Sequence, residues 1–489
     1  MKGPLVVVGD ALLDIDVVGR AERLSPDAPV PVLDSLVEHA RPGGAALAAL
    51  MAARDGHDVV LITAIGADAA GQQLRELLGD IQLIEVAYDG PTPVKRRVRA
   101  GRQPIARLDS GSTVGRYGEV ACEAAGALAG AASVLVSDYG RGLTSVAALR
   151  DLLAERSPGI PSVWDPHPRG ASPVAGIHLV TPNLNEARAW ASRHDAAASD
   201  EMTPLARTRA DATILARAWQ PHAVVVTMGA RGALLSYADG TPMVTPAPDV
   251  HCVDPCGAGD RFAVSAAVAL GSGELLAEAV HAAVMSASAY VAAGGPCHLS
   301  SHVPPVVAWS PRQLPPKITS LSSNRGQNVA ELLESVRRHK GIVVATGGCF
   351  DVVHAGHVAT LEAARRLGDC LVVCLNSDAS VRRLKGHGRP LVSMADRALV
   401  LNALGCVDAV VIFDEDTPVT VLRQLRPDLW VKGGDYAGHT MPETAVLETW
   451  GGQTVALPYV RGHSTTQLVR AAASSTQHPS NFLIEGSVV

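Results

Sequence analysis

Aromatic side chains are scarce in this chain of 489 residues, at 3% of the total. Its hydrophobic cores must therefore be packed mainly with small aliphatic residues. The chain also lacks an apolar run long enough to cross a membrane without a charge or a glycine. The apolar run at the start, residues 5–8, is too short for a signal peptide, so we expect a first strand there instead.

No charge of one sign dominates, because the net charge is -6 and both signs are scattered along the chain. A nucleic-acid-binding or membrane-surface protein would carry a basic stripe, so this distribution argues against both partners. Cysteine is also sparse: the eight cysteines are spread thinly, and several, such as Cys370 and Cys374, lie in apolar runs. We therefore expect reduced thiols and a cytoplasmic location.

A turn rich in glycine and histidine, residues 347–357, is the most informative stretch that the chain does contain. It follows an apolar, β-branched run that predicts a buried strand, residues 341–346, and precedes a predicted helix at residues 358–367. Amides at a helix start bind phosphate, and His354 and His357 can donate hydrogen bonds to a triphosphate there. A metal pair or an ordinary turn are the alternatives, but no Cys/His cluster nearby completes a zinc site.

Inside this strand–turn–helix frame, residues 348–357 resemble the GxFDxxHxGH signature of the cytidylyltransferase-like nucleotidyltransferases. The resemblance implies transfer of a nucleoside monophosphate from a nucleoside triphosphate to a phosphorylated acceptor, with release of pyrophosphate. Residues 376–390 and 426–436 resemble, more narrowly, the adenylyltransferases that form ADP-heptose.

By this resemblance His354 and His357 stabilise the transition state at the α-phosphate, and Lys385 binds phosphate. The choice of adenine as the base rests on the resemblance alone. The remaining nucleotide- or sugar-binding residues that it implies are Gly348, Cys349, Phe350, Asp351, Asp378, Arg389, Lys432, Asp435, Ser464, Thr465 and Thr466.

Apolar strands alternate with helical patterns through the first two-thirds of the chain, for example at residues 59–64, 134–137, 162–164 and 224–227. This alternation predicts an α/β fold, a mostly parallel, doubly wound sheet with helices on both faces. Ligands of such sheets bind beyond the carboxyl ends of the strands. Glycines and acidic residues at those ends are therefore candidates, although each alone is also an ordinary turn former.

A Gly-Ala-Gly-Asp turn, residues 257–260, opens the predicted helix at residues 261–270. Consecutive backbone amides in such a turn offer a phosphate site, and the carboxylate of Asp260 can take a proton from an attacking hydroxyl. The alternative is that Asp260 only caps the helix. The glycines on both sides of Ala258 favour the phosphate site.

Residues 1–310 resemble the ribokinase-like sugar kinases. The resemblance implies that Asp260 is the catalytic base, that the amides of Gly257, Ala258 and Gly259 form an anion hole, and that Mg²⁺ is needed. It also implies that Asn183 and Glu186 organise the water shell of that Mg²⁺, with no direct protein ligand, and that Thr227, Gly229 and Gly232 line the ATP site. Two departures concern the sugar contact: Leu47 stands where the family has asparagine, and Pro255-Cys256 replace two threonines.

Four shorter stretches, residues 23–32, 91–97, 107–109 and 137–142, resemble the branch of these kinases that acts on heptose 7-phosphate. In the first, three prolines stiffen an extended segment that fits a lid or a subunit contact. Lys95, Arg107 and Arg141 are cations suited to a sugar phosphate. The alternative is that these side chains are ordinary solvated surface charges. The implied sugar-phosphate residues are Asp10, Asp14, Gly43, Gly44, Lys95, Arg107, Asp138 and Arg141.

We therefore expect a kinase domain at residues 1–315, a proline-rich linker and lead-in helix at 316–340, a Rossmann-like nucleotidyltransferase domain at 341–475 and a tail at 476–489. The two resemblances imply phosphorylation of a heptose 7-phosphate at O1, then formation of ADP-heptose from heptose 1-phosphate, with ATP the substrate of both halves. They also imply a homodimer or higher homo-oligomer formed through the kinase domain.

Three alternatives stay open. The kinase half can act on another sugar phosphate, the second half can use CTP with a polyol phosphate, or the kinase half can serve only as a dimerising or sugar-binding module.

Overall fold

The computed structural model describes residues 3–101, 103–111, 113, 115–195, 202–252, 254–296, 329–434 and 440–458. The chain forms two compact units, Met1–Pro311 and Arg312–Val489, each described here by itself. The predicted linker and the boundary near residue 315 lie largely outside the described residues, so both stay predictions. No helix in the described ranges is long and apolar enough to cross a membrane.

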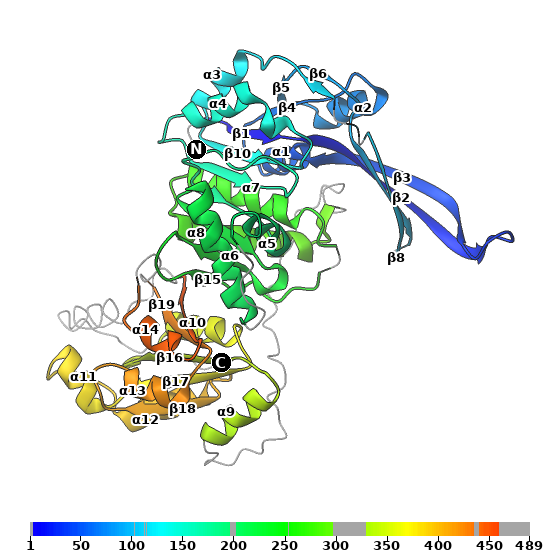
Figure 1. The fold of residues 1–489 in the computed structure, drawn as a ribbon. Coiled ribbons are helices and arrows are strands. Elements are labelled where there is room, and N and C mark those ends of the chain that lie inside the picture. Colours follow the sequence, from blue (N-terminus) through cyan, green and yellow to red (C-terminus); the bar gives the residue numbers. More distant parts are fainter. Residues whose placement is uncertain are drawn as a thin grey trace, which may run out of the picture. The chain divides into compact units, whose positions relative to one another are not determined.

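A large, mostly parallel sheet forms the centre of the first unit, with strand order β15-β14-β13-β12-β11-β10-β1-β4-β5 (Figure 1). Pairing is parallel from β5 to β13, and β14 and β15 are antiparallel. The strands are β1 (Leu5–Gly9), β4 (Val59–Thr63), β5 (Gln82–Glu85), β10 (Ser133–Ser137), β11 (Ser162–Asp165), β12 (Leu179–Val180), β13 (Ala223–Thr227), β14 (Ala233–Ser236) and β15 (Met243–Thr245). The helices are α1 (Ala45–Arg54), α2 (Ala69–Leu78), α3 (Glu123–Ala129), α4 (Ala147–Glu155), α5 (Leu184–Ala191), α6 (Pro204–Trp219), α7 (Ala258–Gly271) and α8 (Leu276–Ala292).

A second sheet of the first unit, here called the lid sheet, has the order β3-β2-β7-β8. It comprises β2 (Ala11–Leu24), β3 (Pro31–Gly44), β7 (Val94–Ala100) and β8 (Gln103–Ser110). Figure 1 shows β2 and β3 running together as a long ribbon away from the large sheet. The short strands β6 (Tyr88–Asp89) and β9 (Arg116–Tyr117) pair separately.

Side chains in the first part of β2 alternate between the two faces of the lid sheet, as the period of two in a strand requires. Leu13, Ile15 and Val17 point to one face and form a buried cluster with Val94. The charged residues between them, beginning with Asp14, therefore share the opposite face. Asp14 lies within β2, because the chain continues as a strand beyond Asp10.

The glycine pair at the end of β3 brings two backbones together. Gly44 has φ +63°, and a Cβ at that position would lie 2.4 Å from the carbonyl oxygen of Asp10. A larger residue there would clash and adopt a left-handed conformation that L-residues avoid. The pair therefore fixes the start of α1 against the end of β1.

The second unit holds a parallel sheet with the order β18-β17-β16-β19-β20. Its strands are β16 (Val343–Gly348), β17 (Cys370–Asn376), β18 (Ala409–Phe413), β19 (Leu429–Gly433) and β20 (Gln453–Leu457). Its helices are α9 (Val329–Arg338), α10 (Ala355–Arg365), α11 (Asp378–Lys385), α12 (Met394–Ala403), α13 (Val419–Leu425) and α14 (Thr444–Glu448). The predicted strand–turn–helix around the two histidines is β16 and α10, shifted by a few residues. The predicted α/β class is confirmed in both units.

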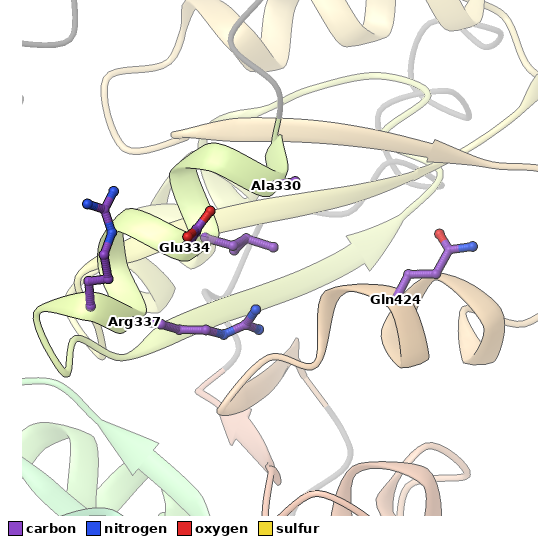
Figure 2. Close-up of a pocket in the computed structure, with 6 residues that line it drawn as sticks. Ala330, Glu334, Arg337 and Gln424 are labelled. Atoms are coloured by element: carbon purple, nitrogen blue, oxygen red, sulfur yellow. The ribbon is translucent and has the colours of Figure 1, made fainter.

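A shallow hollow of about 430 Å³ lies between α9 and α13. Figure 2 shows Glu334 and Arg337 on α9 and Gln424 on the neighbouring α13. The guanidinium of Arg337 donates hydrogen bonds to the carbonyls of Leu425 and Arg426, at 2.5 and 2.9 Å, and so satisfies the end of α13. This arginine is structural, and the hollow contains none of the predicted site residues.

Candidate active sites

The carboxylate of Asp260 lies in the first turn of α7 and is only 6% exposed. The hydroxyl of Tyr139 donates to both of its oxygens, at 2.7 and 2.8 Å. Burial raises the pKa of Asp260 to about 7, the charge of Asp14 adds to the rise, and the Tyr139 hydrogen bond and Lys95 oppose it. Asp260 is therefore a carboxylate that changes protonation near neutral pH, as a general base requires.

Two buried carboxylates build the loop that carries Tyr139. Asp10 accepts hydrogen bonds from the backbone amides of Tyr139, Arg141 and Leu143. Asp138 accepts from the amide of Gly140 at 2.7 Å and from the Thr144 hydroxyl at 2.8 Å. Both carboxylates therefore support this loop, and their predicted contact with the sugar phosphate stays a prediction.

The charged face of the lid sheet carries the other predicted sugar-phosphate residues. Asp14 is paired with Arg97 at 3.1 Å. The ammonium of Lys95 lies 5.0 Å from the centre of the Tyr139 ring, and burial lowers its pKa. Arg107 pairs with Asp109 at 2.7 Å and is more exposed. Lys95 forms no ion pair with any described residue, which leaves it the cation of this face best placed for an incoming phosphate.

The turn before α7 is supported by an apolar cluster and by Asp254, whose carboxylate accepts a hydrogen bond from the Cys256 amide at 3.0 Å. Leu47 is 2% exposed and packs with Met51 and Tyr290 in that cluster. A Cβ on Gly257 would lie 3.3 Å from the Leu47 side chain, so the leucine lies directly behind this turn. The amide of Ala258 donates to the carbonyl of Pro255 at 3.1 Å, so it is not free for the predicted anion hole in this conformation.

The predicted ATP residues meet at the ends of β12 and β13. Asn183 and Glu186 form a capping box at the start of α5, and an isolated bridge pairs Asn183 with Thr227. Gly229 and Gly232 follow in the turn after β13, where both have positive φ. The Asp165 carboxyl lies close enough to Glu186 for the charge of Glu186 to add to burial in raising its pKa. These two side chains form a carboxylate pair. The sequence analysis named Glu186 but not Asp165.

In the second unit, the two motif histidines stand side by side at the start of α10. Their ring centroids are 3.9 Å apart, and Phe350 lies against His357 at 5.3 Å. Burial lowers the pKa of His357 to about 4, and His354 and Lys385 lower it further by charge. Both the pairing of the histidines and the nearness of Lys385 match the predicted triphosphate site.

Three charged residues support the turn between β16 and α10. Asp351 accepts hydrogen bonds from Arg389 and from the Leu391 and Val392 amides, which outweigh burial and lower its pKa. Arg397 is 1% exposed and donates to Asp378 at 2.7 Å and to the Cys349 carbonyl. Asp351, Asp378 and Arg389 thus hold protein groups, and the ligand contacts that the resemblance implies for them stay predictions.

Lys432 contacts the backbone at the start of the same turn. Its ammonium donates to the carbonyl of Gly347 at 3.0 Å, and burial lowers its pKa. Gly348 ends β16 next to this contact. Four predicted residues, Asp435, Ser464, Thr465 and Thr466, lie outside the described residues.

Comparison with known proteins gives two family matches. Residues 3–302 match the pfkB family carbohydrate kinases, and residues 345–476 match the cytidylyltransferase-like family. Over the whole chain, the protein named Bifunctional protein HldE from Streptomyces coelicolor is 53% identical, covering 97% of this chain and 98% of that protein. The chain belongs to the bifunctional HldE family.

Another HldE protein, from Gluconobacter oxydans, is 37% identical over 97% of this chain and 98% of its own length. Among solved structures, the ribokinase of Arabidopsis thaliana with ribose and ATP covers 60% of this chain and 94% of that one, at 21% identity and a TM-score of 0.47. Like other HldE proteins, this chain is an enzyme with a carbohydrate kinase domain and a nucleotidyltransferase domain. The alternative of a kinase half that serves only as a binding module is not favoured.

Sequence reasoning missed three residues of this HldE chain that the structure places at or beside the sites: Tyr139, Asp165 and Arg397. Asp165 follows directly on a run of apolar strand residues, and Tyr139 lies within residues 137–142, which resemble the heptose-kinase branch. Arg397 follows Asp396 in a pair that resembles the adenylyltransferases, but a lone arginine in a helix is ordinarily solvated charge.

Arg397→Met should damage the second unit alone. We expect a loss of about 2 kcal/mol or more in its unfolding free energy, because a buried guanidinium and its charged partner lose their hydrogen bonds. Nucleotidyl transfer should fall at least about tenfold as the turn shifts, with kinase activity unchanged. Denaturant unfolding and the two assays check this. Arg383→Met, which removes an exposed pair with Asp416, is the matched control and should change neither. Equal effects of the two substitutions would contradict the role given to Arg397.

Kinase activity should depend on pH through Asp260. A protonated carboxyl cannot accept the hydroxyl proton, so kcat/KM should fall about tenfold per pH unit below the pKa of about 7 and level off above it. Initial rates between about pH 5.5 and about pH 9 test this. A rate that is flat across the range would contradict the assignment of Asp260 as the titrating base.

Proposed function

We propose that the first unit phosphorylates a heptose 7-phosphate at O1 with Mg-ATP, and that the second unit joins AMP from ATP to a heptose 1-phosphate. The second reaction releases pyrophosphate and forms ADP-heptose, after a separate phosphatase has removed the 7-phosphate. The proposal rests on two features of one chain. The buried carboxylate of Asp260 lies at the start of α7, and the paired rings of His354 and His357 lie at the start of α10. The choice of heptose rests on the short stretches that resemble heptose kinases and adenylyltransferases.

In the proposed kinase reaction, the carboxylate of Asp260 accepts the proton of the sugar hydroxyl as its oxygen attacks the γ-phosphorus of ATP. The bond from that phosphorus to ADP breaks, and ADP departs. Lys95 supplies a cation on the lid sheet for the sugar phosphate, with Arg107 beside it on the neighbouring strand. Positioning and charge neutralisation then provide most of the acceleration, as is usual in phosphoryl transfer.

Mg²⁺ is part of this proposal, and the Asp165–Glu186 pair fits it. Burial raises the pKa of both carboxyls. Neither forms an ion pair with an arginine or lysine of the described residues, and hard cations prefer carboxylate oxygens and water as ligands. Glu186 would hold the ion through water, with Asp165 beside it. Bound there, Mg²⁺ would neutralise charge on the phosphates of ATP.

In the proposed adenylyl transfer, the phosphate oxygen of the sugar attacks the α-phosphorus of ATP and pyrophosphate leaves. His354 and His357 stand at the start of α10, where ring N–H groups and the helix dipole favour an anion. Lys385 adds a positive charge from the last turn of α11. Burial lowers the pKa of His357 to about 4, so this ring is neutral in the free chain and donates from one of its two nitrogens.

Separate substitutions should separate the two activities. Asp260→Asn should abolish the kinase reaction, because the amide cannot accept the proton, and His357→Ala should abolish only adenylyl transfer. The purified chain is given Mg-ATP with heptose 7-phosphate, and separately heptose 1-phosphate with ATP or CTP, and the products are identified by mass spectrometry. Loss of both activities from either change would contradict two independent sites.

The same assay tests the substrates. A heptose bisphosphate in the first reaction and ADP-heptose in the second are the expected products. Preference for CTP, or phosphorylation of other sugar phosphates only, would overturn the substrate assignment while leaving the two enzyme classes intact.

A homodimer through the lid sheet is also our proposal. Exposed apolar side chains gather on the outer part of this sheet, at Leu24, Val30, Leu36, Val37 and Leu108, with exposures from 52% to 61%. Apolar groups in such a patch gain free energy when a second copy covers them.

Leu36→Glu should therefore convert a dimer to a monomer, because the charge would be buried in the contact. Light scattering after size exclusion measures the mass of each variant. Leu399→Glu, at an exposed leucine of α12, is the control and should stay dimeric. A native protein that elutes as a monomer, or a Leu36 variant that stays dimeric, would contradict this interface.

A cytoplasmic location belongs to the same proposal. All cysteines of the described residues are free thiols, including the buried Cys370, Cys374 and Cys406. Free thiols are the usual state in a reducing compartment. Fractionation of the source cells would test it, and recovery of the protein outside the cytoplasm would contradict it.

A further inference from the structure

The phenol of Tyr139 directly contacts the base and has no part in the reaction described above. We propose that Tyr139 is a positioning residue for the kinase reaction, whose O–H orients the Asp260 carboxylate and keeps it ready to accept a proton. The proposal rests on the kinase activity of the first unit and does not depend on heptose being the substrate.

The geometry of the contact is that of one donor shared by two acceptors. The Tyr139 hydroxyl lies 2.7 Å from one oxygen of Asp260 and 2.8 Å from the other. A single proton between both oxygens fixes the rotation of the carboxyl group. Because a carboxylate offers about four lone-pair positions, others stay open to a substrate hydroxyl. The phenol thus aligns the base without blocking it.

The position of Tyr139 is itself fixed by buried groups. Its backbone amide donates to Asp10 at 3.0 Å, and the amide of the next residue, Gly140, donates to Asp138. On the ring, the ammonium of Lys95 lies 5.0 Å from the centre. Such a cation over a ring face is an attractive contact. Tyr139 therefore connects the lid sheet, through Lys95, to the base on α7.

The charged and titratable groups around Asp260 come from five other elements or loops. Asp14 on β2, Asp165 on β11 and Tyr290 on α8 interact unfavourably with its negative charge or share its surroundings. Lys95 on β7 favours the charged form, and the thiol of Cys256 lies near Tyr139 in the turn before α7.

Among these neighbours, Tyr139 provides the direct hydrogen bond to the carboxylate. That bond is weakened when Asp260 is protonated and is lost when the hydroxyl is removed. A hydrogen bond to an ionised group offsets part of the cost of burying it.

Tyr139→Phe tests the proposal with little change in volume. We expect the acid limb of kinase kcat/KM to move to higher pH by about one unit, with about a tenfold loss of rate below the limb and partial recovery above it. The KM for ATP and the adenylyltransferase activity of the same chain should stay unchanged. A purely structural role would lower the rate equally at every pH, and that result would overturn the proposal.

Tyr117→Phe is the matched control. Its hydroxyl donates to the carbonyl of Arg141 at 2.9 Å, in the same loop but away from Asp260. This variant should keep the acid limb where the native enzyme has it. An equal shift in both variants would show that the loop, not the contact with the base, sets the limb, and would overturn the proposal.

A difluorotyrosine placed at position 139 gives a second test that keeps the ring and hydroxyl, and so does not depend on the phenylalanine variant folding. Fluorine makes the phenol a stronger donor. The acid limb should then move to lower pH, opposite to the shift in Tyr139→Phe. A limb that does not move, or moves upward, would contradict the proposed hydrogen bond.

Discussion

The kinase half of this chain depends on keeping one carboxylate out of water without neutralising it. Burial alone disfavours the charged form of Asp260 strongly. The Tyr139 hydroxyl and the nearby charge of Lys95 offset part of that cost, and they come from different layers of the unit. Tyr139 lies in the loop after β10, Lys95 on the lid sheet and Asp260 on α7. The hydrogen bond to Asp260 therefore requires that these three parts of the first unit keep their relative positions.

The second unit also buries a charged side chain, in this case a cation. Arg397 is almost fully buried, and its guanidinium is accommodated because Asp378 and the carbonyls of Cys349 and Val392 accept its hydrogen bonds. The carboxylate of Asp351 accepts hydrogen bonds from the Arg389 guanidinium and the Leu391 amide, and so holds residues 389–392 in place. The rings of His354 and His357 lie side by side at the start of α10, with centroids 3.9 Å apart, and these neighbouring charged residues hold the turn that precedes them.

Periodicity and turn chemistry in the sequence predict the class of both folds and most strands, because these depend on local patterns. They predict Asp260, His354 and His357 as well, since glycine turns at helix starts mark them. They do not separate Asp10 and Asp138, which hold backbone amides, from residues that face ligand, because both kinds follow strands. Arg397 and the Tyr139–Asp260 contact depend on residues 19 and 121 positions away, and no local pattern records such a partner.

The packing of the turn before α7 explains why leucine, and not the asparagine of the ribokinase-like pattern, stands at position 47. An asparagine there would place an amide among Met51, Tyr290 and Val291, in a cluster that is otherwise mostly apolar. Burying an unpaired amide in such surroundings is unfavourable. Leucine instead fills the space behind Gly257, and the turn that presents Asp260 is supported by packing. The side chain at position 47 therefore supports the base on α7 through the backbone of Gly257.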